Sequence, residues 1–357
     1  MLLGTGRVGK EGFMSVTGQV LGQTAEGQVD KPARSGSSLR RPLNVLQRGA
    51  LPIAWVLLIA GFGVASPHIF LTAANFQTMF GSQAVLLVLT LALIVPLTAG
   101  DYDLSVAGVL TLSSMLVAVL NVQHGWPIGA AIVAAVVLGA VVGLINGAIM
   151  IFFGIESLIV TLGMGTLLSG VTLWISQSAT ISGVSQSLVD AVIVYKIGGI
   201  SLAFYYGLAL CVLMWWVFEY TSVGRRLLFV GRGRSVSKLS GVKVSKVRIG
   251  SLVCSGVLAA GGGVLYAGTT GGADPSSGAT FLLPAFAAAF LGATSIMPGR
   301  FNPWGTLIAV YFLVTGITGL QILGVQSYVQ QLFYGGALLC AVALSQLARG
   351  RVPLETN

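Results

Sequence analysis

TSVGRRLLFVGRGRSVSKLSGVKVSKVR, residues 221–248, holds eight basic residues and no acidic residue, and long apolar segments enclose it on both sides. Hydrocarbon excludes such a segment, because each buried cation costs several kcal/mol unless it is shielded. Positively charged loops stay on the cytoplasmic side during membrane insertion. The segment therefore predicts a multi-spanning membrane protein, with this loop as its largest cytosolic feature. Glu219 just before it is predicted to pair with Arg225 or Arg226.

The composition indicates the same class of protein. The chain is 55% hydrophobic and 8% charged, with a mean hydropathy of +0.91, whereas a soluble domain is about 25% charged. The net charge of +9 gathers in the N-terminal arm, in residues 221–248, at Arg300 and near the C-terminus. That distribution is typical of a topology signal and of affinity for the lipid bilayer, and it argues against nucleic-acid binding. The three cysteines lie inside apolar segments and lack metal-site spacing.

Ten apolar segments follow the N-terminal arm, each near the roughly 20 residues that span a bilayer. They cover residues 49–66, 80–98, 103–121, 127–151, 157–176, 201–220, 247–268, 281–297, 303–323 and 328–348. We therefore predict an all-α polytopic membrane protein with about ten transmembrane helices. An even number of spans places both termini on one side, and the basic loop makes that side cytoplasmic. Of the 19 Lys and Arg residues, only Lys196 then lies in an external loop.

The chain divides into three predicted parts. Residues 1–47 are rich in Gly, Ser and Gln and predict a disordered basic cytoplasmic arm, residues 48–349 a transmembrane domain, and residues 350–357 a short cytoplasmic tail. Residues 4–10 read GTGRVGK, but Glu11 follows where a phosphate-binding loop has Ser or Thr, and no βαβ pattern surrounds it. No Ser–His–Asp or Cys–His set can be assembled on one side of the membrane. We expect no enzyme, no bound metal and no cofactor on this chain.

Three glycines in the fourth predicted span indicate close helix packing. Gly139, Gly143 and Gly147 recur at every fourth residue, so they line one helix face. Small residues on one face let membrane helices approach closely, and packing is the favoured interpretation. Asn146, beside these glycines, either hydrogen-bonds across helices or faces a translocation path.

Acidic residues are the least expected feature of the apolar part. Asp101 and Asp103 interrupt the sequence LTAGDYDLSV, residues 97–106. An acid at membrane depth normally faces a cavity or has a partner, which makes both residues candidates for a path or gate. Alternatively, Asp103 and Ser105 cap the third span. Glu156 is either a path residue or a first-turn acid of the fifth span.

Several of these residues belong to ordered motifs. The motifs are GDYDLSV (100–106), GLING (143–147) with GIESLIVTLG (154–163), the basic loop over 221–242, and LGATS (291–295). Together, across roughly residues 50–348, they resemble permease subunits of bacterial ATP-binding-cassette (ABC) importers for monosaccharides. This branch includes the ribose, xylose, arabinose and autoinducer-2 permeases. Four motifs in the same order are more specific than any single glycine motif.

The resemblance implies a transport subunit in the bacterial inner (plasma) membrane. Two permease subunits would enclose a central path, and a periplasmic sugar-binding protein would dock on the external loops. A separate ATPase subunit, which carries ATP and magnesium, would press on the cytoplasmic loop. The residues implied for ATPase coupling are Arg225, Arg232, Arg234, Ser235, Val236, Ser237, Lys238, Leu239, Ser240 and Gly241. Those implied for the path or gate are Asp101, Asp103, Asn146, Glu156 and Thr161.

The chain departs from the family pattern at three places. Residues 235–238 read Ser-Val-Ser-Lys where the family has Glu-Ala-Ala-Arg. Glu156 replaces a proline, and residues 298–301 replace a more glycine-rich turn. The first departure indicates an ATPase contact adapted to a particular partner. Homodimer and heterodimer both stay open, and so does the identity of the sugar.

Two other functions compete with this interpretation. A stand-alone ion-coupled secondary transporter predicts buried ionisable groups and inverted repeats. Asp101 and Asp103 are the candidates for such coupling, and no internal repeat is evident in the sequence. A membrane scaffold or receptor subunit without transport predicts no continuous polar path.

Overall fold

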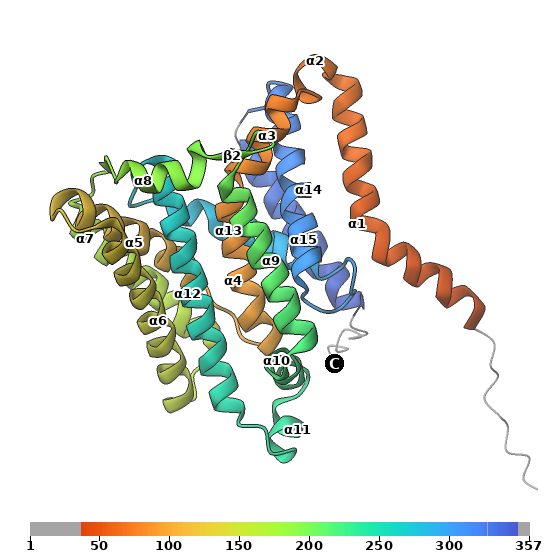
Figure 1. Ribbon diagram of the computed structural model, residues 1–357. Helices are drawn as coiled ribbons and strands as arrows, with labels where there is room; N and C mark the ends of the chain where they lie inside the picture. The colour runs from red at the N-terminus through yellow and green to blue at the C-terminus, as the bar shows by residue number, and fades with distance from the viewer. Residues whose placement is uncertain (1–36, 327, 349–357) are drawn as a thin grey trace, which may run out of the picture. The chain divides into compact units, whose positions relative to one another are not determined.

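The computed structural model of the protein describes residues 37–326 and 328–348 (Figure 1). The longer helices are α1 (Ser37–Ala65), α3 (Ala73–Ser82), α4 (Ala84–Ala99), α5 (Val106–Ala118), α6 (Ile128–Phe152), α7 (Ser157–Ser176), α9 (Leu202–Tyr220), α10 (Ser222–Arg232), α12 (Val244–Thr270), α13 (Ser277–Gly292), α14 (Pro303–Ile322) and α15 (Tyr328–Ala348). The short helices are α2 (Pro67–Phe70), α8 (Gln186–Val189) and α11 (Arg234–Leu239), with two π-helical turns, η1 (Val119–Gln123) and η2 (Asp190–Val194).

Four two-residue strands complete the secondary structure. They are β1 (Ile181–Ser182), β2 (Lys196–Ile197), β3 (Ile200–Ser201) and β4 (Gly272–Ala273). Strand β1 pairs antiparallel with β4, and β2 pairs antiparallel with β3. The β1–β4 pair ties the segment after α7 to the end of α12. Strand β2 and α8 lie at the end of the helices opposite to α10 and α11 (Figure 1).

The membrane character follows from the helices themselves. All ten apolar segments fall on helices. Within the described residues, six helices are long and apolar enough to cross a membrane, and α3 with α4 forms a seventh candidate bent by 41°. Three shorter apolar helices are Gly49–Ala65, Ser277–Gly292 and Tyr328–Ala343. The prediction of an all-α polytopic membrane protein is therefore confirmed.

Helix α1 begins earlier than the sequence predicted. It starts at Ser37, inside the segment 1–47 that was expected to be a disordered arm. Leu39, Leu43 and Leu46 recur at helical spacing, which explains a helix that continues into the first apolar segment. The remainder of the predicted arm, residues 1–36, and the predicted tail, residues 350–357, lie outside the described residues.

Helix α4 lies at the centre of the unit formed by Pro42–Asn357, and all 16 of its residues are buried. Its sequence AVLLVLTLALIVPLTA is apolar on every face. A helix without a polar face is stable only where other elements cover all of it. Helices α12, α13, α9 and α10 pack against it, so α4 places its C-terminal end, at Ala99, inside the protein.

The three glycines of α6 face α12. A methyl group built on Gly139 would lie 2.7 Å from the Ala260 Cβ and would also overlap the carbonyl oxygen of Gly256. A methyl group on Gly143 would lie 2.7 Å from the Cα of Val253. Gly147 meets the same helix at Ile249, at 3.0 Å from its Cα. A methyl group at Gly139 or Gly143 would overlap the backbone of α12, and one at Gly147 would make a tight contact, so the glycines let the two backbones approach closely.

Candidate functional site

The turn between α4 and α5 is the most polar buried part of the protein, and Gly100 begins it. Gly100 adopts a positive φ of 80° and ends α4 with an N–H bond to Leu97 O. Residues with a Cβ rarely adopt this conformation. The chain then turns inward, so that Asp101 and Asp103 are each only 1% exposed. Tyr102, between them, points away and is exposed.

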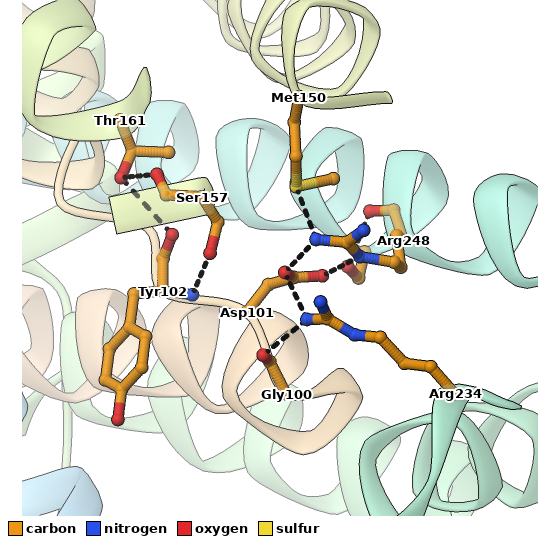
Figure 2. Close-up of polar contacts among 9 residues, drawn as sticks. Gly100, Asp101, Tyr102, Met150, Ser157, Thr161, Arg234 and Arg248 are labelled. Atoms are coloured by element: carbon orange, nitrogen blue, oxygen red, sulfur yellow. Dashed lines mark hydrogen bonds and ion pairs between the residues drawn. The ribbon is translucent and has the colours of Figure 1, made fainter. Parts of the chain in front are cut away.

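Asp101 is held by two arginines from distant parts of the chain (Figure 2). Arg248, in α12, donates from Nε to Asp101 Oδ2 at 2.8 Å and from Nη2 to Oδ1 at 2.6 Å. Arg234, in α11, donates from Nη2 to Asp101 Oδ1 and to the Gly100 carbonyl, both at 2.8 Å. Paired charge-assisted bonds of this kind are the stronger class of hydrogen bond in proteins. One carboxylate therefore joins α11, the α4–α5 turn and α12.

The three side chains differ in exposure, and this difference ranks the contributions of the two ion pairs to the stability of the fold. The Asp101 side chain is 0% exposed, that of Arg248 13% and that of Arg234 46%. Loss of one partner from a buried ion pair leaves an uncompensated charge and costs roughly 3–5 kcal/mol. An ion pair with a half-exposed partner contributes about 0–1 kcal/mol. Arg248 is thus the main structural partner of Asp101, and loss of the half-exposed Arg234 is expected to cost less.

Helix α7 holds the same turn through its first two polar side chains. Ser157 Oγ accepts a hydrogen bond from the Tyr102 N–H at 3.0 Å, and Thr161 Oγ1 accepts one from the Leu104 N–H at 3.0 Å. The Thr161 hydroxyl has the carbonyl oxygens of Ser157 at 2.8 Å and Tyr102 at 3.2 Å within reach. The backbone of the turn is thereby satisfied by side chains, as buried peptide groups require.

Asp103 belongs to a second, cation-free set of contacts. Its Oδ1 accepts hydrogen bonds from the Ser105 hydroxyl at 2.5 Å and from the Ser105 N–H at 3.1 Å. Asn146, in α6, donates from Nδ2 to Ser105 Oγ at 2.9 Å. The carboxylate of Asp103 thus bonds Ser105, the N-cap residue of α5, whose own side chain makes no cap bond to the helix. Asn146 is fully buried and reaches across helices rather than to solvent.

Four of the five predicted path residues therefore meet at this turn, and Glu156 does not. Glu156 precedes α7, is exposed, and makes no side-chain cap bond to that helix. The predicted pairing of Glu219 is also wrong. Glu219 pairs with Arg300 at 2.9 Å, because the turn between α13 and α14 lies at the end of α9, whereas Arg225 is exposed on α10.

The predicted coupling segment forms two short helices, α10 and α11. Gly231 contacts the carbonyl oxygen of Thr98, so α10 packs against the C-terminal end of α4. Ser237 is buried and its hydroxyl lies 2.9 Å from the Phe229 carbonyl and 2.8 Å from that of Gly233, which fixes α11 against α10. Exposed positions of the predicted set are Arg225, Arg232, Arg234, Ser235, Val236, Lys238, Leu239, Ser240 and Gly241. Val236 is 59% and Leu239 89% exposed.

Sequence reasoning missed two residues of this arrangement, Arg248 and Ser157. Arg248 was treated only as a topology charge, and Ser157 was not singled out, whereas Ser105 was named as a possible cap of the third span. A signal for Arg248 existed: a buried acid needs a cation, and residues 221–248 supply cations. No such signal marked Ser157, because the hydroxyl of a serine satisfies backbone groups in many contexts.

The ion pairs of Asp101 with Arg234 and Arg248 bear on the hypothesis of an ion-coupled secondary transporter. That alternative depends on a free buried carboxylate that binds a proton or a cation. Asp101 is neutralised by two arginines, so one of its two candidate residues is engaged in a structural ion pair.

Comparison with known proteins identifies the family of the chain. A protein-family model described as "Branched-chain amino acid transport system / permease component" matches residues 75–342. The D-allose transport system permease protein AlsC of Escherichia coli is 31% identical over 291 residues, which cover 82% of this chain and 89% of the relative. The ribose import permease protein RbsC of the same species is 29% identical over 304 residues, with 81% and 91% covered.

A third relative and the search for solved structures complete the comparison. The L-arabinose ABC transporter permease protein AraH of Azospirillum brasilense is 28% identical over 332 residues, which cover 90% of this chain and 93% of the relative. No solved structure matches the chain. The relatives are named as transport permeases rather than as enzymes, and the family model covers the helices that carry the turn, the basic loop and the glycine crossings. The chain therefore belongs to this family of transport-system permease components.

Proposed function

We propose that the chain is the membrane-spanning permease subunit of an ABC importer that moves a sugar or a sugar-like solute across the bacterial inner membrane. A periplasmic binding protein delivers the solute, and a separate ATPase subunit binds ATP and magnesium. The relatives support a sugar because they are named for D-allose, ribose and L-arabinose. The family description names branched-chain amino acids, which makes an amino acid the alternative solute.

The proposed topology has about ten spans with both termini in the cytoplasm. Besides the seven candidates, the shorter apolar helices within α1, α13 and α15 occupy three of the predicted segments. This count places α10, α11 and the turn at Asp101 on the cytoplasmic side. Positive charge at that side follows the rule for membrane insertion.

Helix α11 is proposed as the element on which the ATPase acts. Its exposed Val236 and Leu239 offer an apolar contact beside the exposed cation of Lys238. The observation that carries this proposal is the bond from Arg234 to buried Asp101. A displacement of α11 by the ATPase would pull directly on the α4–α5 turn and, through the shared carboxylate, on Arg248 of α12. Hydrogen-bond and salt-bridge networks of this kind carry energetic coupling between distant parts of a protein.

The path is proposed to run near the turn, along α5, α6 and α7. Asp103, Asn146 and Thr161 are the polar side chains there that belong to the predicted set. The side chains of α6 and α7 are mostly exposed in the single chain, with 28% and 17% of their apolar windows buried. Such faces are available to lipid or to a second permease subunit, either an identical copy or a related chain.

Co-purification tests the coupling proposal. Tagged protein is extracted from its host in mild detergent, and proteins that co-purify are identified by mass spectrometry. We expect a P-loop ATPase with the wild-type chain, and its loss with Val236→Asp or Leu239→Asp. The matched control is Ile197→Asp, which changes an exposed apolar residue (56% exposed) on β2 at the opposite end.

Uptake into proteoliposomes tests the solute and the energy source. The ATPase and the binding protein are reconstituted with the permease, and ATP-dependent uptake of D-allose, D-ribose, L-arabinose and L-leucine is measured. Uptake of a sugar but not of leucine supports the proposal. Uptake by the chain alone under a proton or sodium gradient, without an ATPase, would establish the secondary transporter instead.

A further inference from the structure

An apolar crevice opens between the cytoplasmic halves of α4, α9, α10 and α12. Its volume is about 290 Å³, and most of the side chains that line it are apolar. Helix α12 contributes Val247, Gly250, Ser251 and Cys254. These residues are spaced i, i+3, i+4 and i+7, so they form one continuous face of the helix. The crevice therefore runs along this apolar face of α12, where a hydrocarbon chain can lie.

Two cations, Arg226 on α10 and Lys246 on α12, stand at one end of the crevice. The same two residues also line an adjoining cavity of about 420 Å³, together with Lys243 and Gly241. No acidic residue lines either cavity. Within the described residues, none of these three cations forms an ion pair. We call the crevice the apolar chamber and the adjoining cavity the basic chamber. Both are lined by Arg226 and Lys246, and no acidic residue of either lining compensates these two charges.

Gly250 shows that the crevice is open space rather than a packing gap. A methyl group built on Gly250 would meet no atom within 4 Å. Glycine weakens the middle of a helix relative to alanine. In the same helix, Gly256 is required because it touches the backbone of Gly139. No contact with a described residue requires Gly250, and a larger side chain there would occupy the crevice.

We propose that this crevice binds an anionic phospholipid, with one acyl chain along α12 and the phosphate between Arg226 and Lys246. Basic pockets between membrane helices at the cytoplasmic side bind anionic head groups. A zwitterionic lipid would leave the positive charge of the basic chamber uncompensated. A free phosphate would leave the apolar chamber unfilled. The bound lipid would lie between α10 and α12 and next to the helix that carries the coupling segment.

Native mass spectrometry of the delipidated, detergent-purified chain tests the proposal. The titrants are dioleoyl-phosphatidylglycerol, dioleoyl-phosphatidylcholine and, as the head group alone, glycerol 3-phosphate. We expect one phosphatidylglycerol per chain, bound at least tenfold more tightly than phosphatidylcholine, and no comparable binding of glycerol 3-phosphate. Both Gly250→Leu, which fills the crevice, and the double change Arg226→Gln/Lys246→Gln should lower that affinity to the level of phosphatidylcholine.

Matched controls separate this site from general attraction. The double change Arg225→Gln/Lys238→Gln removes the same charge from the same loop, outside both chambers. Gly261→Leu enlarges another glycine of α12 that has nothing within 4 Å. Both controls should keep full phosphatidylglycerol affinity. Equal losses in test and control variants, equal binding of the two lipids, or tight glycerol 3-phosphate binding that Gly250→Leu leaves intact would each overturn the proposal. Gel filtration verifies that every variant is folded.

Discussion

Arg234 Nη2 lies 2.8 Å from Asp101 Oδ1, although 133 positions separate the two residues in the chain. Arg234 sits on the exposed helix α11, whereas Asp101 is buried at the end of the central helix α4. The same carboxylate accepts two hydrogen bonds from Arg248 of α12. The Arg234 side chain therefore connects the contact surface proposed for the ATPase directly to the core of the membrane domain.

The first prediction concerns the stability of this ion-pair set. Asp101→Asn leaves Arg248, whose side chain is 13% exposed, without its counter-charge, and we expect a loss of roughly 3–5 kcal/mol. Arg234→Gln removes only the half-exposed partner and should cost about 0–1 kcal/mol. Thermal unfolding in detergent measures both. It is followed with a thiol-reactive dye that reports exposure of buried Cys211, in a background in which half-buried Cys254 and exposed Cys340 are replaced by alanine.

The order of the two variants decides the assignment. A midpoint for Arg234→Gln as low as that for Asp101→Asn would mean that Arg234 is the structural partner. Lys196→Gln, a change of an exposed cation at the other end of the helices, serves as the control and should leave the midpoint unchanged.

The second prediction separates coupling from stability. Arg234→Glu places an acid beside Asp101, and like charges in contact repel. We expect the assembled importer to keep its ATPase subunit and its ATP hydrolysis but to lose most ATP-dependent solute uptake. The ratio of solute transported to ATP hydrolysed, in proteoliposomes, is the measurement. Normal stoichiometry in this variant would refute the coupling role of Arg234.

Charge reversal at Arg232 and deletion of Gly241 extend the same test. Arg232 ends α10 without an ion pair to any described residue, and Gly241 ends the segment with a φ of 80°. Deletion of Gly241 changes the register of the segment that leads into α12. We expect uncoupled hydrolysis from both variants with normal membrane insertion.

The sequence predicted most of the helices because apolar length is a strong signal. Each of its ten segments is mostly helical. The spacing of Gly139, Gly143 and Gly147 predicted a closely packed face, and the structure adds that this face packs against α12. The division of α3 from α4 at Gln83 was not visible, because a bend needs only one residue with non-helical angles. The start of α1 was misplaced, because polar and charged residues and Pro42 separate the three leucines of that stretch, so it lacks the apolar length of a span.

The sequence identified most of the individual residues of the site, but it did not predict how they are arranged in space. Asp101, Asp103, Asn146 and Thr161 were all named, yet the sequence gives no distance between α4, α6, α7 and α11. The bonds that unite them span 41 to 147 residues of chain. Charge counting pairs a buried acid with some cation of the loop, and only packing selects Arg234 and Arg248 from the eight present.

The third prediction concerns the α6–α12 crossing. Gly139→Ala adds a methyl group that overlaps the backbone of Gly256 and lies 2.7 Å from the Ala260 Cβ. Because neither backbone is free to yield, we expect a lower unfolding midpoint and less folded protein in the membrane. Gly129→Ala, in the same helix with nothing within 4 Å, is the control. It should be neutral or slightly stabilising, because alanine favours helix over glycine by about 1 kcal/mol.

The fourth prediction concerns the proposed topology, and single cysteines test it. In a chain whose three native cysteines are replaced by alanine, a membrane-impermeant maleimide should label Lys196→Cys, Asp274→Cys and Val325→Cys in intact spheroplasts. Lys238→Cys and Met297→Cys should react only after the membrane is permeabilised. Met297 follows α13, whose apolar helix of Ser277–Gly292 is one of the shorter ones. Labelling of Met297→Cys in intact cells would show that α13 does not cross the membrane. Equal labelling of Lys196→Cys and Lys238→Cys would place both ends of the helices on one side and would refute the orientation inferred from the basic loop.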